Sequence, residues 1–283
     1  MQLVRRIRQS TSHPPKVAEI SLPWGSALVI SPGEDIGRCL WTTGVYEPAV
    51  TEILWRLVDA GDVTVDAGAN IGYMTSVLAA RVGCNGRVYA FEPHPQVRAR
   101  LRENIENWRR TLGWSQIQEC PSALSNGSGS GFLHTGAGFD TNQGTASFTP
   151  QSPNTLRIEV ARTTLDDVVG NESSIALLKL DVEGHEHEAL LGASRLLERG
   201  AIRDIVFESS CEPQRPIELL ERHGYQVFRI LRGLLKPLLK PARSSSPPSW
   251  EPPNYLATRD AARCLERLRP FGWRMLAGSP ESR

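Results

Sequence analysis

The segment Val63–Gly72, which reads VTVDAGANIG, decides the fold of this 283-residue chain. The apolar run Val63–Val65 predicts a short buried strand that leads directly into a turn with two glycines and an asparagine. A helix is expected next, from about Tyr73 to Arg81. Asn70 stands where a further glycine would be expected, and asparagine tolerates the left-handed backbone that such a turn requires. A strand, a glycine-rich turn and a helix in this order begin a parallel sheet with crossover helices.

The same alternation continues on both sides of this segment. It predicts an α/β fold of the Rossmann-like, doubly wound type, in which helices cover both faces of a mostly parallel sheet. Helices are expected over Glu47–Ala60, Gln96–Trp108, Glu186–Arg199 and Ile217–His223, and strands over Arg87–Phe91, Ile117–Leu124, Ile175–Leu180, Ile202–Phe207, Tyr225–Ile230 and Asn254–Thr258.

Two segments interrupt the alternation. Residues 125–153 are rich in Gly, Ser, Thr and Asn, which predicts an inserted hairpin or loop. Residues 231–253 contain six prolines and a run of three serines, which predicts a loop. We therefore divide the chain into an N-terminal extension, residues 1–45, and a single domain, residues 46–283, that contains both segments.

The composition excludes several classes of protein. With 40% apolar and 22% charged residues, the composition is not that of a disordered or fibrous chain. A membrane-spanning helix needs about 20 consecutive apolar residues, and no apolar run of the sequence is nearly that long. The N-terminus has no apolar stretch typical of a secretory signal, so we expect no export. Five scattered cysteines without a C-x-x-C pair indicate reduced thiols and a cytoplasmic protein.

The charge of the chain is unevenly distributed. The net charge of +1 gives no electrostatic indication of nucleic-acid binding. From Arg229 onward, however, the chain has 11 Lys and Arg against 4 Asp and Glu. This basic C-terminal part indicates either an anionic or glycan-bearing partner or, more simply, a solvated surface.

Two acidic residues indicate which ligand the first turn would hold. Asp66 lies at the mouth of the turn, and Glu92 lies at the end of the next strand, where a carboxylate can accept hydrogen bonds from both hydroxyls of an adenosine ribose. A dinucleotide such as NAD would bring phosphate close to Asp66, and the G-x-G-x-x-G spacing is absent. S-adenosylmethionine carries a sulfonium and an ammonium instead, so the sequence favours this methyl donor over a dinucleotide.

A second polar cluster follows the predicted strand Ile175–Leu180. The run Lys179–Glu188 reads KLDVEGHEHE, and its place in the chain puts it at the same edge of the sheet as the Asp66 turn. Asp181 and Glu183 point to one side if the strand extends that far.

The remaining candidates are histidines and one further acid. His185 could act as a general base, because its ordinary pKa lies near neutrality and methylation of an alcohol or amide releases a proton. His187 is interpreted as an exposed residue of the first helical turn. The Asp, Glu and His cluster would also suit a divalent metal, but Gly184 should end the strand, so no metal is expected. Glu208 ends a strand and could orient a substrate hydroxyl.

With these strand ends placed, the chain resembles the FkbM family of class I S-adenosylmethionine-dependent methyltransferases. The resemblance extends from about Tyr46 to Ile230, roughly two-thirds of the chain. The matching stretches are VDAGANIGY from Val65, VYAFEP from Val88 and KLDVEGHE from Lys179, with looser matches at Gly44–Pro48 and Val206–Glu208.

This resemblance implies a sheet of seven strands, of which the last is antiparallel. It implies that the acceptor is selected by residues before Ile36, after Leu231 and within Gly129–Pro150, where the match ends or weakens. Family members methylate hydroxyls of sugars or natural products, or side-chain amides of peptides. The implied donor contacts come from Glu47, Asp66, Gly68, Ala69, Asn70, Gly72, Glu92, Ser122, Ala123 and Asp181.

We therefore predict a methyltransferase of natural-product biosynthesis that acts on a small-molecule, glycan or peptide acceptor. The acceptor atom would attack the methyl carbon in line. His185, together with Glu183 or Glu208, would orient and deprotonate the acceptor. The alternatives are N-methylation of peptide amides, a nicotinamide-dependent oxidoreductase, and an inactive methyltransferase fold that serves as a binding subunit. Association into a homo-oligomer stays open.

Overall fold

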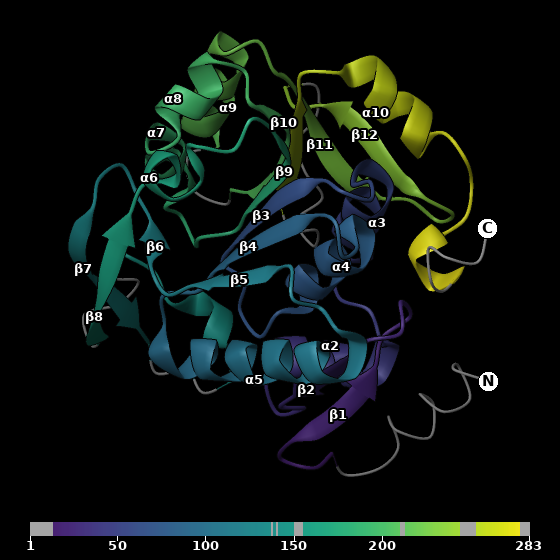
Figure 1. Ribbon diagram of the computed structural model, residues 1–283, viewed down its shortest axis with the longest axis vertical. Helices are drawn as coiled ribbons and strands as arrows, with labels where there is room; N and C mark the ends of the chain where they lie inside the picture. Colours follow the sequence, from purple (N-terminus) through teal and green to yellow (C-terminus); the bar gives the residue numbers. More distant parts are fainter. Residues whose placement is uncertain are drawn as a thin grey trace.

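The computed structural model describes residues 14–136, 138–139, 141–149, 155–209, 213–243 and 253–277. Its centre is one twisted sheet of eight strands (Figure 1). From one edge to the other these strands are β12 (Pro237–Pro241), β11 (Gln226–Arg232), β13 (Asn254–Thr258), β10 (Ile202–Glu208), β9 (Ile175–Leu180), β3 (Val63–Ala67), β4 (Arg87–Phe91) and β5 (Ile117–Cys120).

The strand directions confirm the predicted α/β class and add one strand to it. β3, β4, β5, β9 and β10 are parallel, whereas β13 is antiparallel to both of its neighbours, as expected for the last strand. The eighth strand, β12, lies within 231–253, so the prediction of a loop throughout that segment is wrong. Proline is tolerated at the ends of an edge strand because no further strand needs its missing N–H group, and Pro237 and Pro241 occupy those ends.

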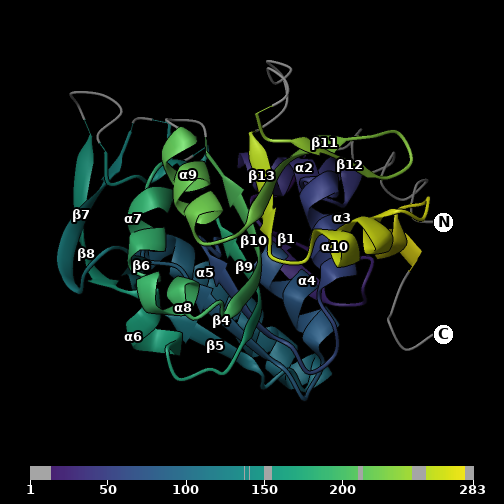
Figure 2. The ribbon, with the colours of Figure 1, turned by 90° about the horizontal axis from the view of Figure 1, so that it is seen from above.

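Helices cover both faces of the sheet (Figures 1 and 2). Each face has its own hydrophobic core cluster, which is the arrangement of a doubly wound fold. One face carries α3 (Pro48–Leu57), α4 (Tyr73–Val82), α5 (Pro95–Leu112) and α10 (Ala261–Leu268), and the other carries α6 (Leu165–Val169), α7 (Glu186–Leu191), α8 (Ser194–Glu198) and α9 (Gln214–Arg222).

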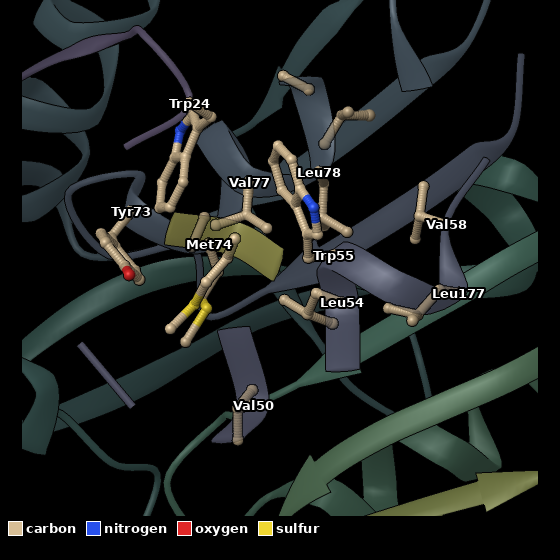
Figure 3. Packing of buried hydrophobic residues seen from close by; sticks show 14 of the residues in the cluster. Trp24, Val50, Leu54, Trp55, Val58, Tyr73, Met74, Val77, Leu78 and Leu177 are labelled. Atoms are coloured by element: carbon tan, nitrogen blue, oxygen red, sulfur yellow. The ribbon is translucent and has the colours of Figure 1, made fainter. Parts of the chain in front are cut away.

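Figure 3 shows the first of these clusters. Leu54 of α3, Val77 of α4 and Leu177 of β9 belong to this cluster, and all three side chains are fully buried. Trp24 packs edge-on against Tyr73, with the ring centroids 5.4 Å apart. This packing fixes the two helices whose first residues reach the carboxyl edge of the sheet.

Two predicted elements are divided in the structure. The helix expected over Glu186–Arg199 becomes α7 and α8, and it is interrupted at Gly192, where a Cβ atom would lie 2.0 Å from the carbonyl oxygen of Ser125. The strand expected over Ile117–Leu124 is interrupted at Pro121, which lacks the N–H group that a central strand donates.

A second sheet has three strands, β6 (Ala123–Leu124), β8 (Leu156–Thr163) and β7 (Gly129–Thr135), in that order, and of these only β7 lies within the predicted insertion of residues 125–153. β7 and β8 are an antiparallel pair, as a hairpin requires, but β8 lies beyond residue 153 where the insertion was expected to end. The segment between them returns toward the main sheet, where the backbone N–H of Asp35 donates to the carbonyl oxygen of Thr141 at 2.9 Å.

The described part of the N-terminal extension packs against α5. β1 (Ala18–Ser21) and β2 (Ala27–Ile30) form an antiparallel pair, and α2 (Asp35–Thr43) follows. Val29 donates its backbone N–H to Asn104 Oδ1 at 2.8 Å, and buried residues of this region join the α3–α4–α5 cluster. Residues 14–43 therefore contribute to the core that supports the carboxyl edge of the sheet.

Candidate active site

A cavity of about 340 Å³ opens at the carboxyl ends of β3, β4, β9 and β10. Ligands of open α/β sheets bind at this edge. Three of the predicted site residues, Asp66, Gly72 and His185, do not line the cavity. The predicted residues that do line it are Glu47, Gly68, Ala69, Asn70, Glu92, Ser122, Ala123, Asp181, Glu183 and Glu208.

Gly68 is the point of closest backbone approach in the cavity. Its φ is +79°, and a Cβ atom there would lie 1.8 Å from the carbonyl oxygen of Asp181. The N–H groups of Gly68 and Ala69 both donate to the carbonyl oxygen of Phe91, at 3.0 and 2.9 Å. Only glycine fits this position, because the backbone is left-handed and the Asp181 carbonyl leaves no room for a Cβ atom.

Glu92 and Asn70 form the neighbouring wall. Glu92 accepts hydrogen bonds from the backbone N–H groups of Asn70 (3.0 Å, to Oε2) and His94 (2.9 Å, to Oε1). Asn70 has the left-handed backbone expected from the sequence, with φ of 50°. Burial raises the pKa of Glu92 to about 7. Each carboxylate oxygen keeps lone-pair capacity for a hydroxyl donor, as a ribose-binding acid requires.

Gly72 serves packing rather than the cavity wall. Its φ is +98°, and a Cβ atom there would lie 2.8 Å from Leu101 Cδ1 and 2.9 Å from the ring of Trp108. The glycine thus lets α5 approach the start of α4, which sets the position of the whole turn.

Asp66 lies behind the cavity and not at its mouth. Its side chain is fully buried, accepts a hydrogen bond from Thr75 Oγ1 at 2.6 Å, and lies 3.8 Å from Lys179 Nζ. Lys179 in turn bonds Asp181 Oδ2 at 3.1 Å. Burial alone would lower the pKa of Lys179, but the Asp181 and Asp66 carboxylates raise it above its ordinary value. This triad holds the strand end that carries Asp181.

The remaining cavity wall is acidic. Glu47 accepts a hydrogen bond from Asn254 Nδ2 at 3.2 Å, and burial followed by the nearby Asp181 carboxylate raises its pKa to about 7. Glu183 lies at the mouth, where partial burial, then Asp181 and Glu208, raise its pKa to about 8. Water at the mouth screens part of this shift, and the upward direction follows from both burial and like charge.

Three residues of the cavity wall hold strained backbone. Among the described residues other than glycine, those with positive φ are Glu47 (40°), Asn70 (50°) and Glu183 (52°), and each of them lines the cavity. Such conformations cost of order 1 kcal/mol or more and concentrate at functional sites. Two of the three place a carboxylate in the cavity.

His185 lies beside the cavity rather than in it. Its Nε2 is 3.0 Å from Ser125 Oγ. Its ring packs at a tilt of 34° against Phe148, which lines the cavity, with the ring centroids 4.5 Å apart. Burial lowers the pKa of His185, which favours its neutral form. α7 begins at Glu186, as the sequence predicted, and places His185 at the position just before the helix.

Several residues of the cavity wall were not predicted as site residues from the sequence. Lys179 was quoted as part of a motif, but its role between two carboxylates depends on the register of β3 and β9. Asp35 and Ile36 come from α2, and Tyr46 precedes α3. The insertion contributes Asn142, Gln143, Gly144, Thr145, Ala146 and Phe148 to the cavity wall.

The charge of the cavity fits a cationic ligand. Among the residues that line it, Lys179 is the one Lys or Arg, and it is already engaged by two carboxylates. A phosphate group would meet uncompensated negative charge, whereas the sulfonium and ammonium of S-adenosylmethionine would be stabilised. The lining carboxylates are Asp35, Glu47, Glu92, Asp181, Glu183 and Glu208.

Comparison with known proteins defines first the class and then the family. A family model described as the methyltransferase FkbM domain matches residues 66–227, which is more than half of the chain. The chain is a methyltransferase, and it belongs to the FkbM family. The nicotinamide-dependent alternative is thereby excluded. The fold is one that binds S-adenosylmethionine.

Individual relatives are more distant. The hexuronic acid methyltransferase AglP of Haloferax volcanii is 26% identical over 208 residues, which is 73% of this chain and 80% of AglP. The crystal structure of the FkbM methyltransferase of Methylobacillus flagellatus has 17% identity and a TM-score of 0.45, over 77% of this chain. This chain spans about half of that protein, 52% of its length. Fibrillarin of Aeropyrum pernix, crystallised with S-adenosylmethionine, has 14% identity and a TM-score of 0.43 over 86% of this chain and 99% of its own.

Membrane-spanning helices, metal ligands and cysteines were also considered in the sequence, and the described residues show the following. No helix there combines the length and the apolar character needed to cross a bilayer. In the same part of the chain, no three His, Cys, Asp or Glu side chains are grouped as metal ligands. Cys39, Cys84, Cys120 and Cys264 are free thiols, whereas Cys211 lies outside the described residues.

Proposed function

We propose that the enzyme methylates a hydroxyl group of a sugar or sugar-containing natural product, with Glu183 as the group that accepts the hydroxyl proton. The observation that carries this proposal is the place of Glu183 at the mouth of the cavity, on a left-handed backbone, beside Asp181 and Glu208. A carboxylate surrounded by like charge is a better base than an ordinary one, because its raised pKa lies nearer to the working pH.

The neighbouring residues would hold the two ligands in line. S-adenosylmethionine supplies an electrophilic methyl group on a positively charged sulfur. Glu92 would accept hydrogen bonds from the ribose hydroxyls, Gly68 would allow close approach to the backbone, and Asp181 would face the positive charge. Glu208 would accept a hydrogen bond from the acceptor and keep its reacting oxygen aligned, and this alignment supplies much of the rate.

His185 has an indirect place in this proposal. It contacts the cavity through Phe148, and Ser147 Oγ donates to the carbonyl oxygen of Glu183 at 2.8 Å. Phe148 and Ser147 belong to the inserted segment, so His185 would fix that segment over the base. We therefore propose His185 as a positioning residue, whose loss changes the affinity for the acceptor more than the rate of the chemical step.

A sugar acceptor is supported by the similarity to a hexuronic acid methyltransferase over 80% of that relative's length. The cavity differs from one suited to a uronic acid, since its lining carboxylates outnumber its single lysine. A neutral hydroxyl acceptor meets no such repulsion, and we propose one here.

The test is a single-turnover assay of labelled methyl transfer to sugars, polyketides and peptides, with wild type, Glu183→Gln and the matched surface variant Glu198→Gln. General-base catalysis contributes about 10²–10⁴-fold. We expect transfer to a hydroxyl, a loss of that size in Glu183→Gln with unchanged donor affinity, and no loss in Glu198→Gln, because Glu198 is exposed on α8.

The pH profile gives a second readout of the same proposal. The carboxylate form of Glu183 is the active one, so kcat/KM should rise with pH through the raised pKa and then level off. A label found on a peptide amide nitrogen, or unchanged turnover in Glu183→Gln, would contradict the proposal.

A further inference from the structure

Two segments distant in the sequence form one basic and apolar surface, which we call the hairpin-tip face. It consists of residues 232–240, from the β11–β12 hairpin, and residues 267–276, which run from the last two residues of α10 into the segment after it. Residues 232–240 contain three Lys and Arg and no acid, and residues 267–276 contain three Arg and no acid. Six of the 11 Lys and Arg from Arg229 onward therefore lie on this face.

Hydrogen bonds join the two segments directly. Gly272 donates its N–H to the carbonyl oxygen of Leu235 at 3.0 Å, and Trp273 Nε1 donates to that of Leu234 at 3.2 Å. Lys236 Nζ donates to the carbonyl oxygen of Arg269 at 2.7 Å. Figures 1 and 2 both show the hairpin beside the yellow C-terminal segment.

The face rests on a buried ion pair of α3. Arg56 Nε lies 2.6 Å from Glu52 Oε1, and both side chains are fully buried. Glu52 also accepts the backbone N–H of Arg274 at 2.7 Å, and Arg56 donates to the carbonyl oxygen of Pro270 at 2.7 Å. The segment that presents Phe271 is thus held in one conformation by the core.

Large apolar side chains project from this face into water. Leu234 is 92% exposed and Phe271 is 74% exposed, and Leu235, Leu238 and Leu276 are exposed as well. Lys236 Nζ lies 5.2 Å from the centre of the Phe271 ring. A group of exposed apolar side chains in fixed backbone marks an interaction surface.

The same two segments also carry exposed cations. Arg232, Lys240, Arg269 and Arg274 are all exposed. We propose that the hairpin-tip face binds the enzyme peripherally to a membrane surface that carries anionic lipid. The leucines at the tip would enter the boundary between headgroups and acyl chains, and the cations would contact the lipid phosphates.

The chemistry of the face favours a bilayer over a nucleic acid. A nucleic acid would use the cations and could stack one base on Phe271, but the four exposed leucines, Leu234, Leu235, Leu238 and Leu276, offer no stacking surface and no hydrogen bond to bases. A bilayer uses both features, because apolar burial and anionic attraction together give stable attachment where one signal alone is marginal.

The test is co-sedimentation of the full chain with vesicles of phosphatidylcholine alone and vesicles with about a third phosphatidylglycerol. We expect binding to the anionic vesicles that weakens at high salt. Leu234→Ser should weaken it by about tenfold, since one leucine is no longer buried. Lys240→Glu and Arg269→Glu should each weaken it by about fivefold or more.

Matched controls separate this face from general surface effects. Leu156→Ser replaces a leucine that is 75% exposed on β8, and Arg110→Glu replaces an exposed arginine of α5. Both variants should bind vesicles as wild type does. Donor affinity, measured by calorimetry, should be the same in all these variants, because none of the changed residues lines the cavity.

Three outcomes would overturn the proposal. The first is equal binding to neutral and anionic vesicles, or none to either. The second is wild-type vesicle binding by Leu234→Ser. The third is self-association or RNA binding that Leu234→Ser abolishes while vesicle binding stays unchanged, since the face would then serve a second copy of the chain or a nucleic acid.

Discussion

The cavity and the hairpin-tip face are charged in opposite senses and differ in burial. In and behind the cavity, Asp66 and Lys179 are buried and depend on each other and on Asp181. On the hairpin-tip face, cations such as Lys240 and Arg269 are exposed to water. The net charge of +1 conceals an uneven distribution, because the chain from Arg229 onward has 11 Lys and Arg against 4 Asp and Glu and the rest has 21 against 27.

The difference shows how burial decides what a charge does. A buried pair is weak evidence of stabilisation, but removal of one partner is costly because the other is left uncompensated. An exposed charge contributes little to folding and acts instead on whatever approaches the surface. We therefore expect substitutions of the buried residues in and behind the cavity to change folding or donor binding, and substitutions on the face to change association alone.

The largest expected effect is that of Gly68→Ala. Gly61 is the matched control, since its φ is +84° and nothing lies within 4 Å of an added Cβ, whereas the Cβ at Gly68 meets the Asp181 carbonyl. Gly61→Ala should cost about 1 kcal/mol of unfolding free energy, and Gly68→Ala more than about 4 kcal/mol with loss of donor binding. Denaturant unfolding and calorimetry measure both, and equal costs would refute the close approach.

Lys179→Met should have the next largest effect. It leaves Asp66 buried without its cation and should cost about 3–5 kcal/mol. Lys240→Met, on the hairpin-tip face, should change the unfolding free energy by less than about 0.5 kcal/mol. The double variant Lys179→Met with Asp66→Asn should recover part of the loss. Similar losses of unfolding free energy in Lys179→Met and Lys240→Met would contradict the proposed difference between buried and exposed charges.

Glu92→Gln should weaken donor binding by about 10- to 100-fold, because hydrogen bonds to a charged acceptor are lost. The amide would also turn its NH₂ group toward one of the backbone N–H groups of Asn70 and His94. Calorimetric titration with S-adenosylmethionine measures the change. Leu234→Ser provides the comparison and should bind the donor as wild type does, whereas unchanged affinity in Glu92→Gln would reject the ribose assignment.

The smallest expected effect is on the pH dependence of stability. Burial raises the pKa of Glu92 and of Glu186 to about 7, above the value of the unfolded chain. The native state then binds more protons, so stability should fall as pH rises from the unfolded pKa through about 7. Glu186→Gln keeps an acceptor for the N–H groups of Val182 and Gly184 and should reduce this slope by about 1 kcal/mol per pH unit. A slope that stays unchanged would contradict the shift at Glu186.

Much of the sheet could be predicted because its strands are apolar runs bounded by glycine, proline or charge. Arg87–Phe91, Ile175–Leu180 and Asn254–Thr258 are strands with the predicted bounds. β12 was missed because its prolines resemble those of a loop, and an edge strand is where the ladder tolerates them. Its pairing with β11 is a property of the tertiary structure.

Most of the predicted site residues line the cavity, but the sequence did not predict the directions in which their side chains point. The sequence placed Asp66 at the mouth of a turn, but β3 continues to Ala67, so Asp66 alternates to the inside and faces Thr75 and Lys179. The shift of one residue in the end of a strand decides whether a carboxylate faces ligand or core. The resemblance implied that residues before Ile36 help to select the acceptor, but nothing local in Asp35 or Ile36 indicates that these two residues line the cavity.

The position of β13 has a consequence for synthesis of the chain. β13 is made after β10 and β11 but lies between them, and its Asn254 holds Glu47 in the cavity wall. Until residues 254–258 leave the ribosome, the nascent sheet has two strand edges that face each other without hydrogen-bond partners, a state prone to mispairing. One wall of the cavity is therefore completed only after β13 has been synthesised, and ligand capture should begin only when this strand has paired with β10 and β11.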